Sequence, residues 1–218
     1  MKREDALEII LTTKIIAVIR MSNPAKLRPV VEAIQRGGVK AIEITLTTPG
    51  ALDSIREMAA AKPAGVLIGA GTVLDAASAA AVIRAGADFV VSPVLDREVI
   101  RVCRESDTFV APGAFTPTEI LAAWRLGADV VKVFPATSIG PKFFKDMKGP
   151  FPQIRLMPTG GVDLVNAADF VGHGASCVAI GTALLDPKSI ANDDWEGLTA
   201  KAEALVKSLS RAGAGPGR

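Results

Sequence analysis

The sequence predicts an α/β protein that folds as a closed (β/α)8 TIM barrel with an extra N-terminal helix, and three observations favour this class. Short apolar segments that suit buried strands alternate with helical patterns along the chain. Four helical patterns end in a glycine that is followed by an apolar run, at Gly38, Gly86, Gly127 and Gly174. No segment resembles a hairpin turn, so parallel strands are expected, and eight strand–helix units favour a barrel.

The elements are expected in the following order. Residues 1–12 form an amphipathic helix that covers the floor of the barrel. The helices that follow end at glycines suited to a left-handed cap, and the runs after those glycines suit strands covered on both faces. Helical patterns such as PAKLRPVVEAIQR, DAASAAAVIRA and TPTEILAAWRL separate the strands. The eight strands are expected at residues 14–20, 39–46, 66–71, 88–92, 108–112, 129–134, 154–159 and 177–181.

One domain is expected over residues 1–210, followed by a flexible tail at 211–218 that has no core-forming residues. The alternative fold is an open doubly wound sheet. That fold usually carries a glycine-rich GxGxxG turn after its first strand, and no such turn follows VIR. The barrel is therefore the preferred prediction.

Composition excludes several classes of partner. The 218 residues include 25 Lys and Arg against 23 Asp and Glu, a net charge of +2, which leaves no electrostatic footprint for nucleic acid. No apolar run approaches the roughly 20 residues of a membrane helix, and no signal core follows the N-terminus. We therefore expect a cytoplasmic protein that binds neither nucleic acid nor membrane.

Composition also limits the chemistry. Two distant cysteines, Cys103 and Cys177, exclude a disulfide scaffold and a cysteine-rich metal site. A single histidine, His173, leaves little for a histidine-based metal site or a Ser-His-Asp relay. No metal is expected, so any catalysis must use Lys, Glu, Arg, Thr or backbone groups.

Lys132 interrupts the apolar strand VVKVF. Alternation puts Lys132 with Val130 and Phe134 on one strand face, and both faces of a barrel strand are covered. Loss of hydration lowers a lysine pKa and supplies the neutral amine that forms a Schiff base with a carbonyl compound. The alternatives are a lysine paired with a carboxylate as a structural strut, or one that reaches the barrel mouth.

Glu43 favours the catalytic interpretation of Lys132 over the structural ones. In AIEITL the residues Ile42, Ile44 and Leu46 share one face, so Glu43 is expected to point into the barrel. A carboxylate and an amine in one confined interior can act as a proton-transfer pair. A structural Lys–Glu ion pair is the alternative, but desolvation can exceed the attraction within such a pair. The arrangement therefore favours catalysis.

Three other features lie where a barrel forms its active site, at the carboxyl ends of the strands. Arg20 ends the first strand and can either hold a carboxylate through two hydrogen bonds or pair with a loop acid. The turns PTGGV and AIGTAL follow strands seven and eight, where phosphate sites recur in such barrels, although such turns also occur as simple loops. Thr72, in GAGTV, is placed to donate to a substrate oxygen.

These residues lie within longer stretches that match a family. The sequence resembles the class I 2-keto-3-deoxy-6-phosphogluconate aldolases, a family that includes 4-hydroxy-2-oxoglutarate aldolase activity. The resemblance runs from about residue 14 to residue 186, and VKVFPA and GPFPQIRLMPTGGV are its most specific segments. The other matching stretches are IIAVIR, GGVKAIEITLTTPGAL, IGAGTVLD, GADFVVSP, APGAFTPTEI and AIGTALL.

The resemblance implies a cofactor-free, homotrimeric enzyme that cleaves a keto-deoxy sugar acid phosphate to pyruvate and glyceraldehyde 3-phosphate. It places the Schiff-base lysine at Lys132 and the acid/base glutamate at Glu43. The other roles that it implies are pyruvate-carboxylate contacts at Arg20, Thr72 and Thr159, phosphate contacts at Gly160, Gly161, Gly181 and Thr182, and pocket residues Pro93, Phe134 and Thr47.

One position departs from some members, which carry an arginine where this chain has Thr47. This puts in question the strength of carboxylate binding and the choice of substrate, so the galactonate-derived sugar acid and 4-hydroxy-2-oxoglutarate remain alternatives. A non-covalent phosphosugar enzyme and a non-catalytic phosphometabolite sensor would keep the glycine turns without using an imine.

Overall fold

The computed structural model describes residues 1–212; residues 213–218, most of the predicted tail, lie outside the described residues. The strands are β1 (Ile15–Ile19), β2 (Ala41–Thr45), β3 (Leu67–Gly71), β4 (Phe89–Val91), β5 (Phe109–Ala111), β6 (Gly113–Ala114), β7 (Val131–Val133), β8 (Leu156–Pro158) and β9 (Val178–Ile180). All except the two-residue β6 fall inside the predicted strand ranges.

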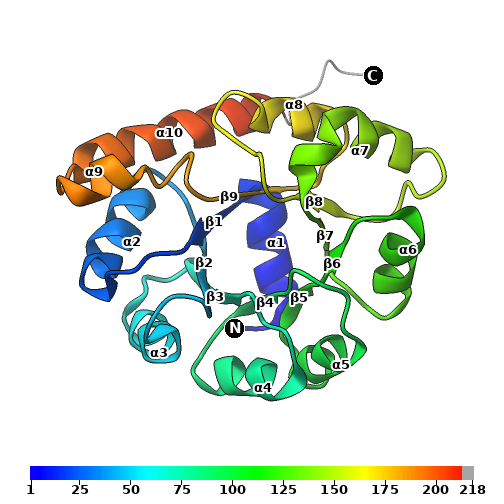
Figure 1. Ribbon diagram of the computed structural model, residues 1–218, viewed down its shortest axis with the longest axis horizontal. Coiled ribbons are helices and arrows are strands. Elements are labelled where there is room, and N and C mark those ends of the chain that lie inside the picture. The colour runs from blue at the N-terminus through cyan, green and yellow to red at the C-terminus, as the bar shows by residue number, and fades with distance from the viewer. Residues whose placement is uncertain (213–218) are drawn as a thin grey trace.

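Residues 1–212 form ten α-helices, which surround the strands except for α1, drawn across their centre in Figure 1. They are α1 (Arg3–Thr13), α2 (Leu27–Arg36), α3 (Ala51–Ala61), α4 (Ala76–Arg84), α5 (Arg97–Glu105), α6 (Pro117–Arg125), α7 (Gly140–Lys148), α8 (Ala167–Gly172), α9 (Pro187–Ala191) and α10 (Trp195–Ala212), with short 3-10 turns at Pro24–Lys26 and Ala136–Ser138. No helix of residues 1–212 is long and apolar enough to cross a membrane.

Every strand pair is parallel, as predicted, and the strands form two curled sheets. The first sheet has the order β5-β4-β3-β2-β1-β9 and the second has the order β6-β7-β8. Pro112 separates β5 from β6, and its carbonyl accepts a hydrogen bond from the Lys132 amide at 2.9 Å. At the other edge, Thr159 forms a parallel bridge with Ala179 of β9. The strands thus curl around a common interior.

The four glycines that end the repeated helical patterns have the expected left-handed backbone. Their φ angles are +92° at Gly38, +100° at Gly86, +101° at Gly127 and +101° at Gly174. Residues with a side chain rarely adopt this backbone conformation, whereas glycine adopts it readily. These glycines can therefore turn the chain from helix to strand within a few residues.

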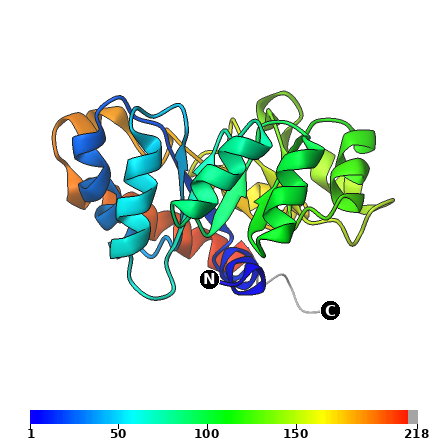
Figure 2. The ribbon, with the colours of Figure 1, turned by 90° about the horizontal axis from the view of Figure 1, so that it is seen from below.

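One buried cluster fills the interior at the amino-terminal ends of the strands, and we call it the interior cluster. Alternate residues of the strands, with Val130 and Cys177 just before β7 and β9, supply Ile16, Ala41, Leu67, Phe89, Val91, Phe109, Ala111, Val130, Met157, Cys177 and Ala179, and α1 supplies Ala6 and Ile10. Figure 2 shows α1 lying across this end of the strands. The predicted role of the N-terminal helix as a floor is therefore confirmed, and the opposite end of the strands, which we call the mouth, is left for ligands.

Candidate active site

The interior cluster shows which strand faces point inward. Ala41 and Val130 belong to it, whereas Ile42, Ile44, Val131 and Val133 pack in the separate core between strands and helices. Alternation therefore points Glu43 and Lys132 into the interior, just above the cluster, as the sequence predicts. Glu43 pairs in register with Val18 and Gly69, while Lys132 pairs with Gly113 and Met157.

Glu43 is 1% exposed, and its Oε2 has no hydrogen-bond partner in the described chain. A buried carboxyl oxygen without a partner is costly, because it loses its bonds to water without replacement. Burial raises the pKa of Glu43, while the positive charges of Lys132 and Arg20 act in the opposite direction. Glu43 Oε2 is therefore a buried acceptor that no protein group satisfies, and burial shifts the carboxyl group toward its neutral form.

Gly71 makes room for that carboxyl group. A Cβ placed on Gly71 would overlap Oε1 and Cδ of Glu43. The backbone angle at Gly71 is not in the left-handed region, so the absence of a side chain, rather than backbone freedom, is what this position requires. The glycine therefore forms one wall of the cradle that holds Glu43.

Lys132 is 6% exposed, and its Nζ lies 5.0 Å from the centre of the Phe134 ring. Burial lowers the pKa of Lys132, Glu43 acts against this shift and Arg20 adds to it. No ion pair within 4.0 Å joins Lys132 and Glu43 in residues 1–212, although the charge of each shifts the pKa of the other. Burial moves both toward their neutral forms, an amine and a carboxylic acid.

Arg20 and two threonines stand around this pair. Arg20 follows the end of β1, is exposed, and is close enough to influence the pKa of both Glu43 and Lys132. Thr72 follows β3 with a left-handed φ of +58°, a conformation that is uncommon outside glycine. Thr159 follows β8, is 8% exposed, and its Oγ1 has no partner in the described chain. A free hydroxyl of this kind can bind a ligand oxygen.

The glycine turn after β8 offers backbone donors. Gly160 and Gly161 have φ angles of +83° and +73°. In residues 1–212 the amide of Gly161 donates to no acceptor, and the same holds for the amide of Thr182 in the turn after β9. A Cβ on Gly161 would lie 2.8 Å from Thr137 Oγ1, which is closer than real Cβ contacts allow. The turn therefore presents unpaired N–H groups and packs closely on the preceding loop, a combination suited to an anion.

The three predicted pocket residues are placed differently. Phe134 is 38% exposed beside Lys132, and Pro93 is half-buried after β4, where its carbonyl would overlap a Cβ on Gly113. Thr47 is exposed, and its hydroxyl lies 2.9 Å from Thr45 Oγ1. Phe134 and Pro93 therefore border the mouth, whereas the Thr47 hydroxyl is engaged with its own loop.

Sequence reasoning missed the cradle formed by Gly71. The segment LIGAG places glycines on two successive inward positions of β3, and this pattern is a signal for a bulky neighbour on an adjacent strand. The first of these, Gly69, lies under the Phe89 ring, and the second faces the Glu43 carboxyl group. No cluster of three or more His, Cys, Asp or Glu that could hold a metal occurs in residues 1–212.

Comparison with known proteins gives consistent results. A 2-dehydro-3-deoxy-phosphogluconate aldolase from Pseudomonas aeruginosa is 41% identical over 200 residues, covering 91% of this chain and 86% of the relative. A probable 2-dehydro-3-deoxy-6-phosphogalactonate aldolase from Rhizobium meliloti is 37% identical over 180 residues, covering 82% and 85%.

A solved structure has a closely similar fold. It is the KDPG aldolase of Legionella pneumophila with pyruvate captured as a covalent carbinolamine, which superposes with a TM-score of 0.85 at 29% identity and covers 91% of this chain and 97% of that one. The family model described as KDPG and KHG aldolase matches residues 7–201. With that match spanning most of the sequence, the chain belongs to the KDPG and KHG aldolase family.

Proposed function

We propose that this enzyme is a Schiff-base aldolase that cleaves 2-keto-3-deoxy-6-phosphogluconate to pyruvate and glyceraldehyde 3-phosphate. The observation that carries the proposal is the pairing, in one buried interior, of an amine whose pKa is lowered with a carboxyl group that has a free oxygen. The Pseudomonas aeruginosa relative, an aldolase of this substrate by name, supports the choice of sugar acid.

Lys132 is the nucleophile in this mechanism. The lone pair of its neutral Nζ attacks the C2 ketone carbon, and a proton passes from the resulting positively charged nitrogen to the ketone oxygen, which becomes the carbinolamine hydroxyl. Glu43 in its acid form protonates that hydroxyl, so water leaves and an iminium forms. The raised pKa of Glu43 suits this first step, because the carboxyl group holds its proton until the hydroxyl needs it.

Glu43 then acts as a base. As a carboxylate it accepts the proton of the C4 hydroxyl, the C3–C4 bond breaks, and its electron pair passes into the iminium. Glyceraldehyde 3-phosphate leaves, and the enamine of pyruvate remains on Lys132. Protonation at C3 and addition of water to the regenerated iminium release pyruvate and restore the free amine.

The remaining site residues hold the ends of the substrate in this proposal. Arg20, Thr72 and the unpartnered hydroxyl of Thr159 bind the carboxylate next to C2. The free amides of Gly161 and Thr182, with Gly160, Gly181 and the Thr182 side chain, bind the phosphate. Phe134 and Pro93 form the walls, and Thr47 lies at the rim.

The galactonate-derived sugar acid is the second candidate substrate. Two observations favour its inclusion: the Rhizobium meliloti relative carries that name, and Thr47 engages Thr45 rather than the mouth. A lactate dehydrogenase-coupled assay of pyruvate release, run on both sugar acids and on 4-hydroxy-2-oxoglutarate, ranks them by kcat/KM. We expect the gluconate-derived substrate to rank first.

The experiment that tests the covalent mechanism is trapping with pyruvate and borohydride. The intact mass should rise by one reduced pyruvate adduct, and peptide mapping should place it on Lys132. Lys132→Ala should abolish both the adduct and turnover, whereas the matched control Lys145→Ala, an exposed lysine on α7, should keep both. An active enzyme without an adduct on Lys132 would favour a non-covalent mechanism instead.

We further infer that the two sheets close into one eight-stranded barrel, in which β5 and β6 form a single strand interrupted at Pro112. The parallel bridge between Thr159 and Ala179 supports closure at the other edge. In this proposal residues 1–210 form one domain, since α1 packs on β1 and β5, α10 packs on α2, α8 and α9, and the two helices contact each other.

A homotrimer in the cytoplasm completes the proposal. Leu74, Val94 and Phe115 are 53%, 49% and 40% exposed, and they follow β3, β4 and β6 at the mouth end. Apolar side chains exposed together in this way are typical of an interface, and a second copy of this chain is the partner that we propose. Two free buried thiols, Cys103 and Cys177, agree with a reducing compartment.

A further inference from the structure

Two half-buried side chains that the proposed function does not use, Asp163 and Asn166, stand between the glycine turn after β8 and the start of α8. The Nδ2 atom of Asn166 donates a hydrogen bond to the carbonyl of Gly161 at 2.8 Å. The Oδ1 atom of Asn166 accepts one from the Asp163 amide at 2.9 Å. Both ends of one side-chain amide are thus bonded, one to the glycine turn and the other to the segment that leads into α8.

Asp163 makes the reciprocal contact. Its Oδ1 atom accepts hydrogen bonds from the backbone amides of Val165 at 2.9 Å and Asn166 at 2.8 Å. Each of the two side chains therefore binds the backbone amide of the other residue. The arrangement also fixes which end of the Asn166 side chain carries the nitrogen, because the Asp163 amide can only donate and the Gly161 carbonyl can only accept. We call Asp163 and Asn166 together the clamp.

The turn that the clamp holds is the most flexible kind of backbone. Gly160 and Gly161 have φ angles of +83° and +73°, and neither has a side chain to restrict its conformation. Glycine loses more conformational freedom on ordering than any other residue, so a fixed turn of two glycines is costly. The bond from Asn166 offsets part of this cost and holds the turn in one conformation before a ligand binds.

The clamp also sets the direction of a backbone amide. The carbonyl of Gly161 and the N–H of Val162 belong to one planar trans peptide, in which the two groups point in opposite directions. Because Asn166 holds the carbonyl, the Val162 N–H points to the other side of that peptide. Neither this amide nor that of Gly161 donates to an acceptor within residues 1–212. Two successive N–H groups are thus left for an anion, in the orientation that Asn166 imposes.

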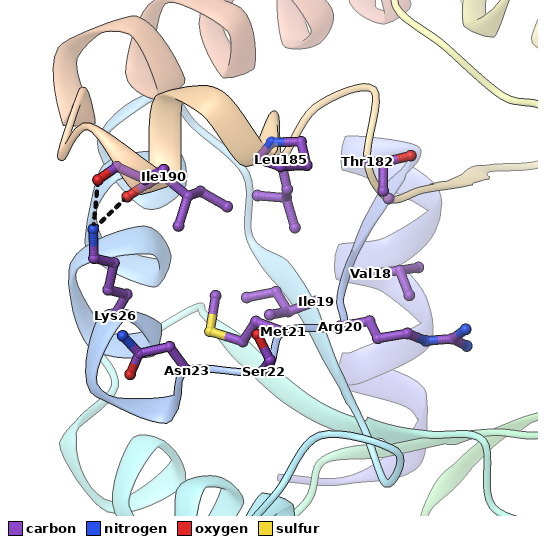
Figure 3. A pocket seen from close by; sticks show the side chains of 13 residues that line it. Val18, Ile19, Arg20, Met21, Ser22, Asn23, Lys26, Thr182, Leu185 and Ile190 are labelled. Carbon is purple, nitrogen blue, oxygen red and sulfur yellow. Dashed lines mark hydrogen bonds between the residues drawn. The ribbon is translucent and has the colours of Figure 1, made fainter.

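The lysine nearest to the turn after β9 is already engaged. Lys26 and Thr182 line the same pocket, with Lys26 at its far side from Thr182 (Figure 3). The Nζ atom of Lys26 donates to the carbonyls of Ile190 and Ala191 at 2.8 and 2.9 Å and lies 3.0 Å from Asp193. The proposed phosphate site therefore relies on backbone and hydroxyl donors, and such donors bind an anion well only when the chain holds them in place.

We propose that Asp163 and Asn166 are positioning residues, which hold the glycine turn in the conformation that binds the phosphate of the sugar acid. The inference rests on the proposed function and adds two residues to it. Neither side chain touches the substrate in this proposal, because both act through the amides of Gly161 and Val162. Binding of the phosphorylated substrate therefore depends on the clamp, whereas formation of the Schiff base at Lys132 does not.

The test measures two quantities in each variant. The KM for the phosphorylated sugar acid reports on the glycine turn. The rate at which pyruvate, which has no phosphate, forms the borohydride-trapped adduct reports on Lys132. Asn166→Ala should raise KM about tenfold and change kcat and the adduct rate less than about twofold, because a net hydrogen bond is worth up to about tenfold in an equilibrium. Asp163→Asn keeps an oxygen for the two amides that Asp163 binds, and should stay within about twofold of wild type in both quantities.

Asp75→Ala is the matched control. Asp75 caps α4 in the loop after β3, where its carboxylate accepts a hydrogen bond from the Ser78 amide at 2.7 Å. The control therefore also removes a side-chain bond to a mouth loop, but one outside the glycine turn. Urea unfolding should show a lower stability for Asp75→Ala and Asn166→Ala alike, and only Asn166→Ala should raise KM.

The outcomes separate the clamp from the proposed function. An Asn166→Ala enzyme with the KM of wild type would overturn the clamp. So would one in which KM, kcat and the adduct rate all worsen together, because that pattern means a general loosening of the fold. In both cases a wild type that forms the adduct and cleaves the sugar acid leaves the proposed function standing. A wild type that does neither would overturn the proposed function, and the clamp with it.

Discussion

At the scale of single residues, the catalytic proposal depends on how Glu43 is held. Its carboxyl group has one oxygen without a partner and another against the Cα of Gly71, where no side chain fits. The glycine thus sets the position of an acid that must reach two different oxygens of the substrate. A shift of about 1 Å in such a group can cost about 10²-fold in rate.

We therefore expect Gly71→Ala to lower kcat about 10²-fold with little change in KM, because the added methyl group displaces the Glu43 carboxyl group. The second change Glu43→Asp, which shortens the side chain, should recover about tenfold of kcat in the Gly71→Ala background while lowering it in the wild type. Ala70→Gly, on the outward face of β3, is the control. Equal losses in Gly71→Ala and Ala70→Gly would assign Gly71 a purely structural role.

The burial of Glu43 also predicts a dependence of stability on pH. Its pKa is raised in the folded protein, so between the unfolded value of 4.5 and the raised value the folded state binds more protons than the unfolded state. The free energy of unfolding then falls as pH rises through that window. Glu43→Gln removes the titrating group and with it this decrease in the free energy of unfolding. In urea titrations the variant should be more stable than wild type at a pH above the raised pKa, and equally stable at pH 4.

Glu43→Gln should also lose activity, by about 10²–10⁴-fold, because the amide cannot move protons. A variant that is less stable than wild type at pH 8 would contradict the direction of the Glu43 pKa shift. Higher stability together with lower activity in Glu43→Gln would show that the wild-type carboxyl group destabilises the folded state and is needed for catalysis.

Alternation along its strand was enough to predict the inward direction of Glu43, because a strand has a two-residue period; for Lys132 it predicted only the face shared with Val130 and Phe134, which the interior cluster identifies as the inner one. Gly71 could not be predicted in the same way. Its role depends on the register between β2 and β3, which pairs Glu43 with Gly69 and Thr45 with Gly71. The same limit applies to Thr159, whose unpartnered hydroxyl depends on the surroundings of β8 rather than on its own segment.

At the scale of elements, the repeated segments GADFV and GADVV place an aspartate at the start of a strand. Asp88 accepts a hydrogen bond from the Ile68 amide at 2.9 Å, and Asp129 accepts one from the Val110 amide at 2.9 Å. Each carboxylate thus pairs with an amide on the preceding strand and also binds a cation, Lys62 or Arg3. The repeated segment therefore supplies a buried carboxylate that links two strands, in addition to the turn from helix to strand.

Asp129→Ala should lower the free energy of unfolding by about 2–4 kcal/mol, because the Val110 amide and Arg3 both lose a buried acceptor. Arg3 lies on α1, so the floor helix is loosened at the same time. Asp129→Asn keeps an acceptor oxygen and should cost about 1–2 kcal/mol. Urea unfolding measures both variants, and equal costs would mean that the hydrogen bond to Val110 contributes nothing.

The element boundaries follow the sequence closely except near Pro112 and α9. Proline has no amide to donate, so the predicted strand at 108–112 ends at Ala111 and pairing resumes at Gly113 with a different neighbour, β7. The short α9 is secured by Lys26, a residue more than 160 positions away along the chain. Such a distant contact leaves no periodic signal in the sequence.

At the scale of the whole molecule, the proposed trimer predicts a mass of three 22.6 kDa chains in light scattering. The double variant Leu74→Asp with Phe115→Asp should run as a monomer, because two exposed apolar side chains at the proposed interface become charged. Val165→Asp, which is exposed on a different loop, should remain trimeric. A wild-type monomer would contradict the assembly and leave the chemistry unaffected.

The floor formed by α1 and the interior cluster has a consequence for the order of events in a catalytic cycle. With Ala6, Ile10, Leu67 and Phe89 filling one end, residues 1–212 leave Lys132 open to solvent from the mouth alone. In the proposed mechanism the aldehyde fragment lies between the bound three-carbon unit and that opening. We therefore expect it to leave before the water that frees the keto acid enters, so that pyruvate is the last product released and inhibits cleavage competitively with the sugar acid.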